Sequence, residues 1–336
     1  MIRLPTTIEA ALEHSTTHDV RAGGTDLQER RNHGLRRRPV LDLRDIPGLD
    51  KIERDGEGLK IGARVRLAEL AEDPWVRERY PALAKGAGSL GNPQIRAVAT
   101  LGGNLLQAPR CPYYRDPEIR CLKSGGSECW ARQGDHLWHV CFANRPCIAP
   151  HASTMGMVLA AYDATVSVAG GAARSVEELY DIGDTLRDHT LDEGVLLTHV
   201  NLPRPWSAER GAYMRATSRA RAEWALVEVA VRVRLDRWES IVDARVAVGA
   251  VANTPLRLRE VERMLIGNVV NEPLFVAAGE KATEGAEPLE DTGYKVELLR
   301  ASVFDALNAA VVSPPSPLID APEGDAPEGE SQGSSK

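Results

Sequence analysis

The sequence predicts an α+β protein with more than one domain, and three observations lead to that prediction. Helix and strand patterns alternate from the N-terminus to about residue 108. A long strand and its antiparallel partner follow a proline-rich stretch near residues 203–210, and helical patterns come after that pair. The 336 residues also exceed the roughly 250 that one hydrophobic core usually serves.

The first half of the chain alternates short helices and strands. Thr6 and Thr7 precede an apolar helical pattern that reaches residue 12, which indicates a capped helix. Residues 19–22 then enter a glycine turn. Hydrophobic periodicity predicts helices over 26–33, 67–70 and 80–87, and strands over 39–43, 59–63 and 65–67.

The second half predicts a smaller α+β unit and a tail. Thr254 and Pro255 carry the signature of a helix start. The tail from residue 313 on is acidic and rich in Pro, Gly and Ser, which predicts disorder. The remaining regular elements are expected at 155–161, then as strands over 164–168, 224–235 and 241–250, and as helices near 273–283 and 295–311.

Composition narrows the class of function. The formal net charge of −7 argues against nucleic acid as a partner. The N-terminus lacks the apolar core of a signal peptide, and no run approaches the roughly 18 apolar residues of a membrane span. The sequence therefore predicts a cytoplasmic protein that works without a membrane. Because cytosolic thiols stay reduced, clustered cysteines there indicate metal or redox chemistry rather than disulfides.

Two glycine turns suggest a phosphate-bearing ligand. The first, residues 22–27, reads Ala-Gly-Gly-Thr-Asp-Leu and leads from a strand into a helix. Glycines let backbone N–H groups approach an anion, and a helix N-terminus adds positive partial charge. The second, residues 100–104, reads Thr-Leu-Gly-Gly-Asn, so two similar turns could grip both phosphates of one dinucleotide. Neither fits the G-x-G-x-x-G pattern, which argues against a Rossmann site.

All five cysteines lie between residues 111 and 147, shortly after the second turn. Four follow the spacing Cys111-x9-Cys121-x7-Cys129-x17-Cys147, which lacks the C-x2-C pairs of zinc ribbons and bacterial ferredoxins. Spacing alone leaves zinc, an iron–sulfur cluster and free thiols open, and Cys141 is a fifth candidate where four are needed. A metal would order this stretch, since it has no helix or strand periodicity. No catalytic acid–base constellation stands out, which fits a cofactor carrier.

Over residues 2–312 the sequence resembles the FAD-binding subunits of the xanthine dehydrogenase, or molybdenum hydroxylase, family. The resemblance is carried by the two glycine turns and by residues 251–255, Val-Ala-Asn-Thr-Pro. It implies an FAD-binding module of two α+β subdomains, of the PCMH type, over residues 1–205. It also implies a C-terminal domain with a three-stranded antiparallel sheet and three helices over 206–312, before the tail at 313–336.

The cysteine stretch is an insertion at about residues 108–150 relative to most of the family. It is similar to that of a subset that includes the 4-hydroxybenzoyl-CoA reductase β-subunit. In that subset the four cysteines that match Cys111, Cys121, Cys129 and Cys147 hold a [4Fe-4S] cluster. Cys141 has no counterpart in the pattern. The resemblance therefore implies FAD and a [4Fe-4S] cluster as cofactors.

The resemblance also implies which residues bind FAD. Thr154 stands where the family usually has an acidic residue, and Arg215 replaces a lysine, which keeps a cation near the flavin. Leu90 stands where a backbone contact to FAD is expected. The expected FAD-binding residues are Val20, Arg21, Ala22, Gly23, Gly24, Thr25, Asp26, Leu27, Leu90, Thr100, Leu101, Gly102, Gly103, Asn104, Thr154 and Arg215.

The implied function is that of a redox subunit without catalytic residues of its own. A molybdopterin-binding large subunit and a [2Fe-2S] small subunit would complete a heterotrimer, single or dimerised. Ferredoxin or NAD would be the external electron partner. Two other functions remain open: a stand-alone flavin oxidase, which should show a base near the flavin, and a non-enzymatic zinc-binding interaction module.

Overall fold

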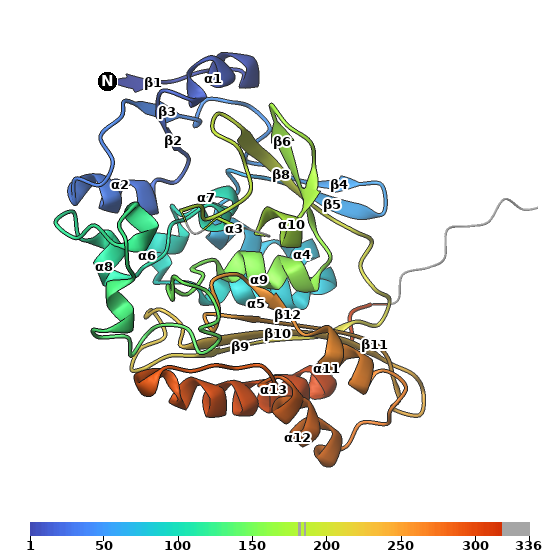
Figure 1. Cartoon of the computed structure of the whole chain (residues 1–336). Helices are drawn as coiled ribbons and strands as arrows, with labels where there is room; N and C mark the ends of the chain where they lie inside the picture. Colours follow the sequence, from blue (N-terminus) through green and yellow to red (C-terminus); the bar gives the residue numbers. More distant parts are fainter. Residues whose placement is uncertain (181–182, 185, 318–336) are drawn as a thin grey trace, which may run out of the picture.

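A computed structural model of the chain describes residues 1–180, 183–184 and 186–317, and Figure 1 shows how they are arranged. The described residues form three β-sheets with helices packed around them, so the expected α+β fold is confirmed. None of the described helices is long and apolar enough to cross a lipid bilayer.

The first sheet is small and parallel. Its strands lie in the order β1 (Ile2–Arg3), β3 (Val40–Asp42) and β2 (Asp19–Arg21), with helices α1 (Ile8–Ser15) and α2 (Thr25–Asn32). The Thr7 hydroxyl caps α1 by accepting a hydrogen bond from the Ala10 N–H (3.2 Å), which confirms the predicted helix start. The first glycine turn joins β2 to α2, so it lies at the carboxyl end of a parallel strand.

The second sheet is antiparallel, with the order β4-β5-β8-β6-β7. Val65 and Leu67 were expected on a strand, and this prediction is wrong. Both side chains are buried, but they lie where the chain enters a helix, whose start is fixed by the Glu69 carboxylate accepting from the Arg66 N–H (3.1 Å). The strands are β4 (Ile52–Asp55), β5 (Gly58–Gly62), β6 (Thr165–Ala169), β7 (Arg174–Ser175) and β8 (Leu196–Leu202).

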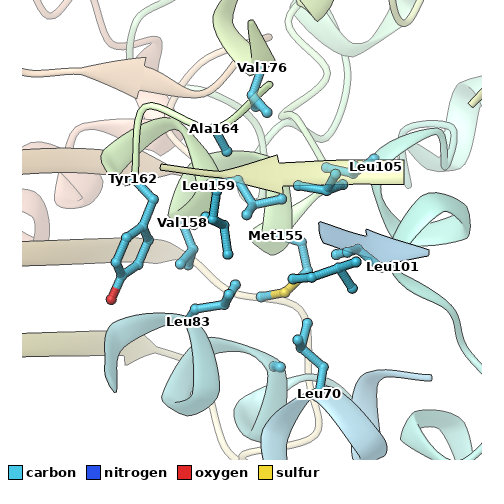
Figure 2. Packing of buried hydrophobic residues seen from close by; sticks show 14 of the residues in the cluster. Leu70, Leu83, Leu101, Leu105, Met155, Val158, Leu159, Tyr162, Ala164 and Val176 are labelled. Carbon is cyan, nitrogen blue, oxygen red and sulfur yellow. The ribbon is translucent and has the colours of Figure 1, made fainter. Parts of the chain in front are cut away.

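Seven helices accompany this sheet in the described part of the chain, and most of them share one core. Figure 2 shows Leu70, Leu83, Leu101 and Met155 meeting in that core, each from a different helix. Every residue of α9 is buried, so this helix is surrounded by protein on all sides. The helices are α3 (Leu67–Glu72), α4 (Pro74–Arg79), α5 (Pro81–Ser89), α6 (Pro93–Arg96), α7 (Leu101–Leu105), α9 (Thr154–Ala161) and α10 (Val176–Leu179).

The third sheet is antiparallel and has α5 and α9 on one face and three C-terminal helices on the other (Figure 1). The three long strands and three helices match the expected C-terminal fold, and one short strand adds to the edge. The strands are β9 (Arg210–Ala216), β10 (Val227–Leu235), β11 (Ile241–Gly249) and β12 (Leu256–Arg257), and the helices are α11 (Arg259–Leu265), α12 (Glu272–Lys281) and α13 (Tyr294–Val312).

The helix start predicted at Thr254 and Pro255 is wrong, because the short strand β12 lies there instead. Its first residue pairs with Val248 of β11, and α11 begins only at Arg259. The guanidinium of Arg257 donates to the Ala160 carbonyl (2.9 Å), which holds this segment extended against α9. Long-range pairing thus overrides a local capping signal.

The cysteine stretch contains one short α-helix and two 3-10 helices in its described residues: α8 (Pro112–Arg115), η1 (Leu122–Ser124) and η2 (Trp130–Arg132). Its own apolar core is small and consists of Ala131, Val140, Ala143 and Ile148 with a few partly buried neighbours. The N–H groups of Cys141 and Phe142 donate to the Val251 carbonyl (3.0 and 3.1 Å), so the stretch also packs on the C-terminal domain.

The disordered tail was predicted from residue 313, and that starting point is too early. Ser316 is buried, its N–H donates to the Glu209 carbonyl (2.7 Å), and its hydroxyl accepts from the Glu209 N–H (2.9 Å). These bonds hold residues 313–317 against the start of β9. The rest of the predicted tail, 318–336, lies outside the described residues.

Candidate cofactor sites

The first glycine turn presents free backbone donors at a helix N-terminus. Gly24 precedes α2 in the left-handed conformation (φ 76°), which glycine adopts without strain, and no side chain caps the helix. Within the described part of the chain, the N–H groups of Thr25, Asp26 and Leu27 have no hydrogen-bond acceptor. Such donors at the positive end of a helix form a binding site for an anion.

The two glycine turns lie against each other. A Cβ on Gly23 would fall 2.1 Å from the Val98 carbonyl oxygen, so only glycine allows this approach. Val98 leads into the second turn, where Thr100 caps α7 by accepting from the Gly103 N–H (3.2 Å). The close packing brings both turns to one place, as the sequence predicted.

The second turn differs from the first in how its amides are used. The Leu101 N–H donates to the Val65 carbonyl (2.9 Å), and the Gly102 N–H donates to the Ala63 carbonyl (2.8 Å). The expectation that both turns offer similar free N–H groups is therefore corrected. The first turn has free N–H groups, whereas the N–H groups of the second turn are used within the protein and this turn only borders the cavities. Gly103 is exposed, and a Cβ there would meet only the Thr100 hydroxyl oxygen (2.9 Å).

Two cavities of about 720 and 760 Å³ meet at these turns, and both are lined by Thr25, Asp26, Gly103 and Gln107. Volumes of this size are typical of cofactor sites. The first cavity has a basic lining, which comprises Arg21, Arg30, Arg36, Arg38, Arg64 and Arg187. The second cavity is bordered by Leu90, Arg110, Arg215 and Trp224.

Among the described residues, several that line these cavities have a buried polar side-chain atom without a hydrogen-bond partner. Arg30 Nε and His18 Nε2 belong to residues that line the first cavity, and Arg110 Nε and Arg215 Nε to residues that line the second. Buried donors of this kind are normally satisfied, so they indicate a polar ligand that extends to either side of the turns. A dinucleotide, with its phosphates at the free amides of α2, fits this arrangement.

Most of the expected FAD-binding residues line one of these cavities. Gly23 and Leu101 face protein, and Thr154 lines a third, neighbouring cavity of about 340 Å³. The Asn104 side chain accepts from the Ser153 hydroxyl (2.8 Å) and thereby holds α9. The residues on the first cavity are Val20, Arg21, Ala22, Gly24, Thr25, Asp26, Leu27, Thr100, Gly102 and Gly103, and those on the second include Leu90, Asn104 and Arg215.

Glu228 is a site residue that the sequence analysis missed. It lies on β10, lines the third cavity and is buried. Its carboxylate accepts from the Thr154 hydroxyl (2.5 Å) and the Tyr213 hydroxyl (2.8 Å), and Arg215 Nη1 lies 3.8 Å away. A carboxylate thus reaches Thr154 from strand β10, although position 154 itself is not acidic. The available signal was an acidic residue within a valine-rich strand pattern, Val227 to Val233.

Four of the five cysteines, Cys111, Cys121, Cys129 and Cys147, line one small cavity. Cys141 is separate from them and lies fully buried in the core of the C-terminal domain. A hydrogen bond from the Cys147 thiol lowers the pKa of Cys129 to about 6, whereas burial raises the pKa of Cys111 to about 11. Within the described residues, no three His, Cys, Asp or Glu side chains are arranged to hold a single metal ion.

Two histidines near the cysteines, His139 and His151, have lowered pKa values. Burial lowers the pKa of His139 to about 4 and that of His151 to about 3. His139 Nε2 lies 3.3 Å from Cys111 Sγ, so this histidine belongs to the surroundings of the thiols. Cys111 also lines the third cavity, which places the cysteine site directly beside the Thr154 and Glu228 pair.

Two protein-family models together match almost all of the two domains described above. Residues 3–205 match the model of a family described as FAD binding domain in molybdopterin dehydrogenase, and residues 212–310 match the CO dehydrogenase flavoprotein C-terminal domain. The chain is 32% identical to the aldehyde oxidoreductase FAD-binding subunit PaoB of Escherichia coli K12, over 92% of this chain and 96% of that protein.

More distant relatives share the same fold. The 6-hydroxypseudooxynicotine dehydrogenase complex subunit alpha of Paenarthrobacter nicotinovorans is 25% identical, over 86% of each chain. Among solved structures, quinoline 2-oxidoreductase from Pseudomonas putida 86 superposes with a TM-score of 0.72 at 22% identity, covering 92% of this chain and 95% of that one. The two relatives from Escherichia coli and Paenarthrobacter nicotinovorans are both named as subunits.

Proposed function

Because the chain belongs to the family of FAD-binding subunits of molybdenum hydroxylases, we propose that it binds both FAD and a [4Fe-4S] cluster and transfers electrons within a multi-subunit oxidoreductase. Its partners would be a molybdopterin-binding large subunit and a [2Fe-2S] small subunit. An external carrier, ferredoxin or NAD, would exchange electrons with this chain. The single observation that carries the proposal is the position of the four-cysteine cavity beside the cavities at the glycine turns.

The residues present fit FAD. The free N–H groups of Thr25, Asp26 and Leu27 would hold a phosphate, and the exposed face of Gly103 leaves room for the ligand on the other side. Bound flavin supplies the electron-transfer chemistry, and the protein supplies binding and electrostatics. Near the second cavity, Arg215 and Glu228 contribute one positive and one negative charge, both buried.

The residues present offer the four thiols that a [4Fe-4S] cluster needs, since Cys111, Cys121, Cys129 and Cys147 share one cavity. A structural zinc site would use four ligands as well, with sulfur at about 2.3 Å from the ion. The choice of the cluster over zinc comes from the resemblance to the subset of the family whose four matching cysteines hold a [4Fe-4S] cluster.

The neighbouring cavities suggest a route for electrons. Arg110 and Pro112 line both the second and the third cavity, and Cys111 stands between these two residues in the chain. A flavin ring in the second cavity would therefore lie on the side of the cysteines. The basic first cavity would then receive the adenosine end. Electrons would pass between flavin and cluster without leaving this chain.

The proposal is tested on the chain co-expressed with the subunits encoded beside it and purified without oxygen. We expect about one FAD per chain, and about four iron atoms per chain beyond the iron of the [2Fe-2S] subunit. Cys121→Ser should lose these four iron atoms and the part of the visible absorbance that the cluster adds, while it keeps FAD and the iron of the partner subunit. Cys141→Ala is the matched control, because Cys141 lies outside the four-cysteine cavity, and it should keep both cofactors.

Two results would contradict the proposal. Zinc without iron in the wild-type chain would favour an interaction module with a structural metal. A chain that oxidises a substrate by itself, with no other subunit present, would favour a self-sufficient flavin oxidase. Three carboxylates and one histidine border the second cavity (Asp26, Glu29, Asp116 and His33), and in the described structure Asp26 and Glu29 are paired with arginines.

A further inference from the structure

The carboxylate of Asp26 points away from the expected phosphate position and toward the cysteine stretch. Asp26 Oδ2 accepts from the Ala108 N–H (3.2 Å), and Asp26 Oδ1 lies 2.6 Å from Arg115 Nη2. Arg110 Nη2 adds a third contact at 3.3 Å. The side chain is only 13% exposed, so these contacts are protected from water. The same residue offers its backbone N–H to the anion site at the start of α2.

Glu29 lies one turn farther along α2, on the same face of the helix as Asp26. It pairs with Arg110, and one of its oxygens lies 3.3 Å from Arg115 Nη1. Two carboxylates of α2 therefore hold two arginines that flank Cys111, one directly before it and one four residues after it.

The guanidinium of Arg115 is held on two sides, by backbone carbonyls of its own loop and by the carboxylates of α2. Its Nε donates to the Pro109 carbonyl (2.8 Å), its Nη2 donates to the Ala108 carbonyl (2.9 Å), and its side chain is 9% exposed. It thus closes the loop that carries Cys111 and fastens that loop to α2. Charged hydrogen bonds with this burial are among the stronger ones in proteins.

We infer that the anion site at the start of α2 and the four-cysteine site are thermodynamically coupled through Asp26 and Arg115, so that FAD binding stabilises the cysteine loop and cluster assembly strengthens FAD binding. Asp26 and Arg115 are positioning residues in this inference, which rests on the proposed function. A ligand at the N–H groups of Thr25 to Leu27 fixes the first turn of α2. That turn orients Asp26, Asp26 orients Arg115, and Arg115 holds the loop around Cys111.

Coupling of this kind must be reciprocal. If FAD stabilises the closed cysteine loop by some factor, then the closed loop strengthens FAD binding by the same factor. Couplings of this type usually amount to about 5- to 150-fold. The small apolar core of the cysteine stretch increases the effect, because polar bonds carry much of its attachment when the metal is absent.

A thiol-labelling experiment tests the inference without requiring iron. The full chain, stripped of iron under anaerobic conditions, is treated with iodoacetamide, and the labelling of each cysteine is followed by mass spectrometry. We expect FAD to slow the labelling of Cys111 by about fivefold or more. Labelling of Cys141, buried in a different core, should not respond to FAD. In Asp26→Asn and in Arg115→Lys, the protection of Cys111 by FAD should be lost.

A binding experiment tests the reverse direction. The Kd of FAD is measured with iron-loaded and with iron-free chain, and the ratio should be about fivefold or more in the wild type and near one in Arg115→Lys. Asp243→Asn removes a carboxylate from another arginine pair, with Arg234 on the C-terminal sheet, and should keep the wild-type ratio.

The outcomes separate this inference from the proposed function. If the chain binds FAD but Cys111 labels at the same rate with and without it, the inference is overturned, whatever the iron content. If the chain never holds iron but FAD protects Cys111 in an Asp26-dependent way, the inference stands and the cluster assignment fails. Retained protection in both Asp26→Asn and Arg115→Lys would also overturn it.

Discussion

Gly103→Ala separates cofactor binding from folding, because this glycine faces the two cavities rather than the core. An alanine at Gly102 would place its Cβ 2.8 Å from the Ala63 Cβ and 3.0 Å from the Ala63 carbonyl oxygen. At Gly103 the only close neighbour is the Thr100 hydroxyl oxygen at 2.9 Å. The added methyl group at Gly103 therefore enters the space where the two cavities meet.

The expected changes follow from these distances. Alanine is favoured over glycine inside a helix by about 0.5–1 kcal/mol, and disturbing the Thr100 cap costs a similar amount, so the stability of the cofactor-free chain should change little. Overfilling a packed contact with FAD costs about 1–3 kcal/mol. That range corresponds to a Kd for FAD that is about 5- to 150-fold weaker.

The assay is the quenching of flavin fluorescence for Kd, combined with urea unfolding of the cofactor-free chain. Gly88→Ala is the matched control, since Gly88 lies in α5, is exposed, and would meet only the Ala71 Cβ at an ordinary 3.5 Å. It should gain slightly in stability and bind FAD normally. If Gly103→Ala binds FAD as tightly as the control does, the cofactor does not pass over the second turn and the reasoning fails.

Two further predictions concern stability. Glu209→Gln should lower the free energy of unfolding by about 3–5 kcal/mol, because it leaves the buried guanidinium of Arg232 (2% exposed, 2.7 Å away) without its counter-charge. A loss below about 1 kcal/mol in urea unfolding would contradict this expectation. Burial lowers the pKa of Lys295 to about 8 from 10.5, so the unfolded chain binds more protons between these pH values and stability should rise with pH across this window. Lys295→Met should flatten that part of the stability curve, and an unchanged slope would exclude the assignment.

Local patterns predicted much of the fold because they operate over a few residues. The cap at Thr7, the strand at β3 and the long C-terminal helix α13 are all encoded by short stretches. The predictions that failed depended on distant partners. Pro255 looked like a helix start, but the pairing of Leu256 with Val248 decided otherwise. Strand β8 was not foreseen because its partners β5 and β6 come from widely separated parts of the chain.

The sequence predicted which types of residue would form the cofactor sites. It predicted less well which partners their side chains would contact. The sequence placed Asp26 in the expected FAD-binding turn, but gave no sign that its carboxylate contacts the cysteine loop. It could not identify Glu228 as the partner of Thr154, since the two residues lie 74 positions apart and meet only in the folded chain. Sequence proximity brought all five cysteines together, and only the family pattern set Cys141 apart from the four that share a cavity.

The way in which the cysteine stretch is held explains why the two cofactors should depend on each other. The C-terminal domain has a large apolar core that stabilises it without any ligand. The cysteine stretch has only a small core, and polar bonds hold it to α2, to the backbone near Val251 and to the start of α13. Because α2 also provides the free amides, a loss of order at its first turn would reach both sites at once. The proposed coupling therefore favours the state in which flavin and cluster are both bound.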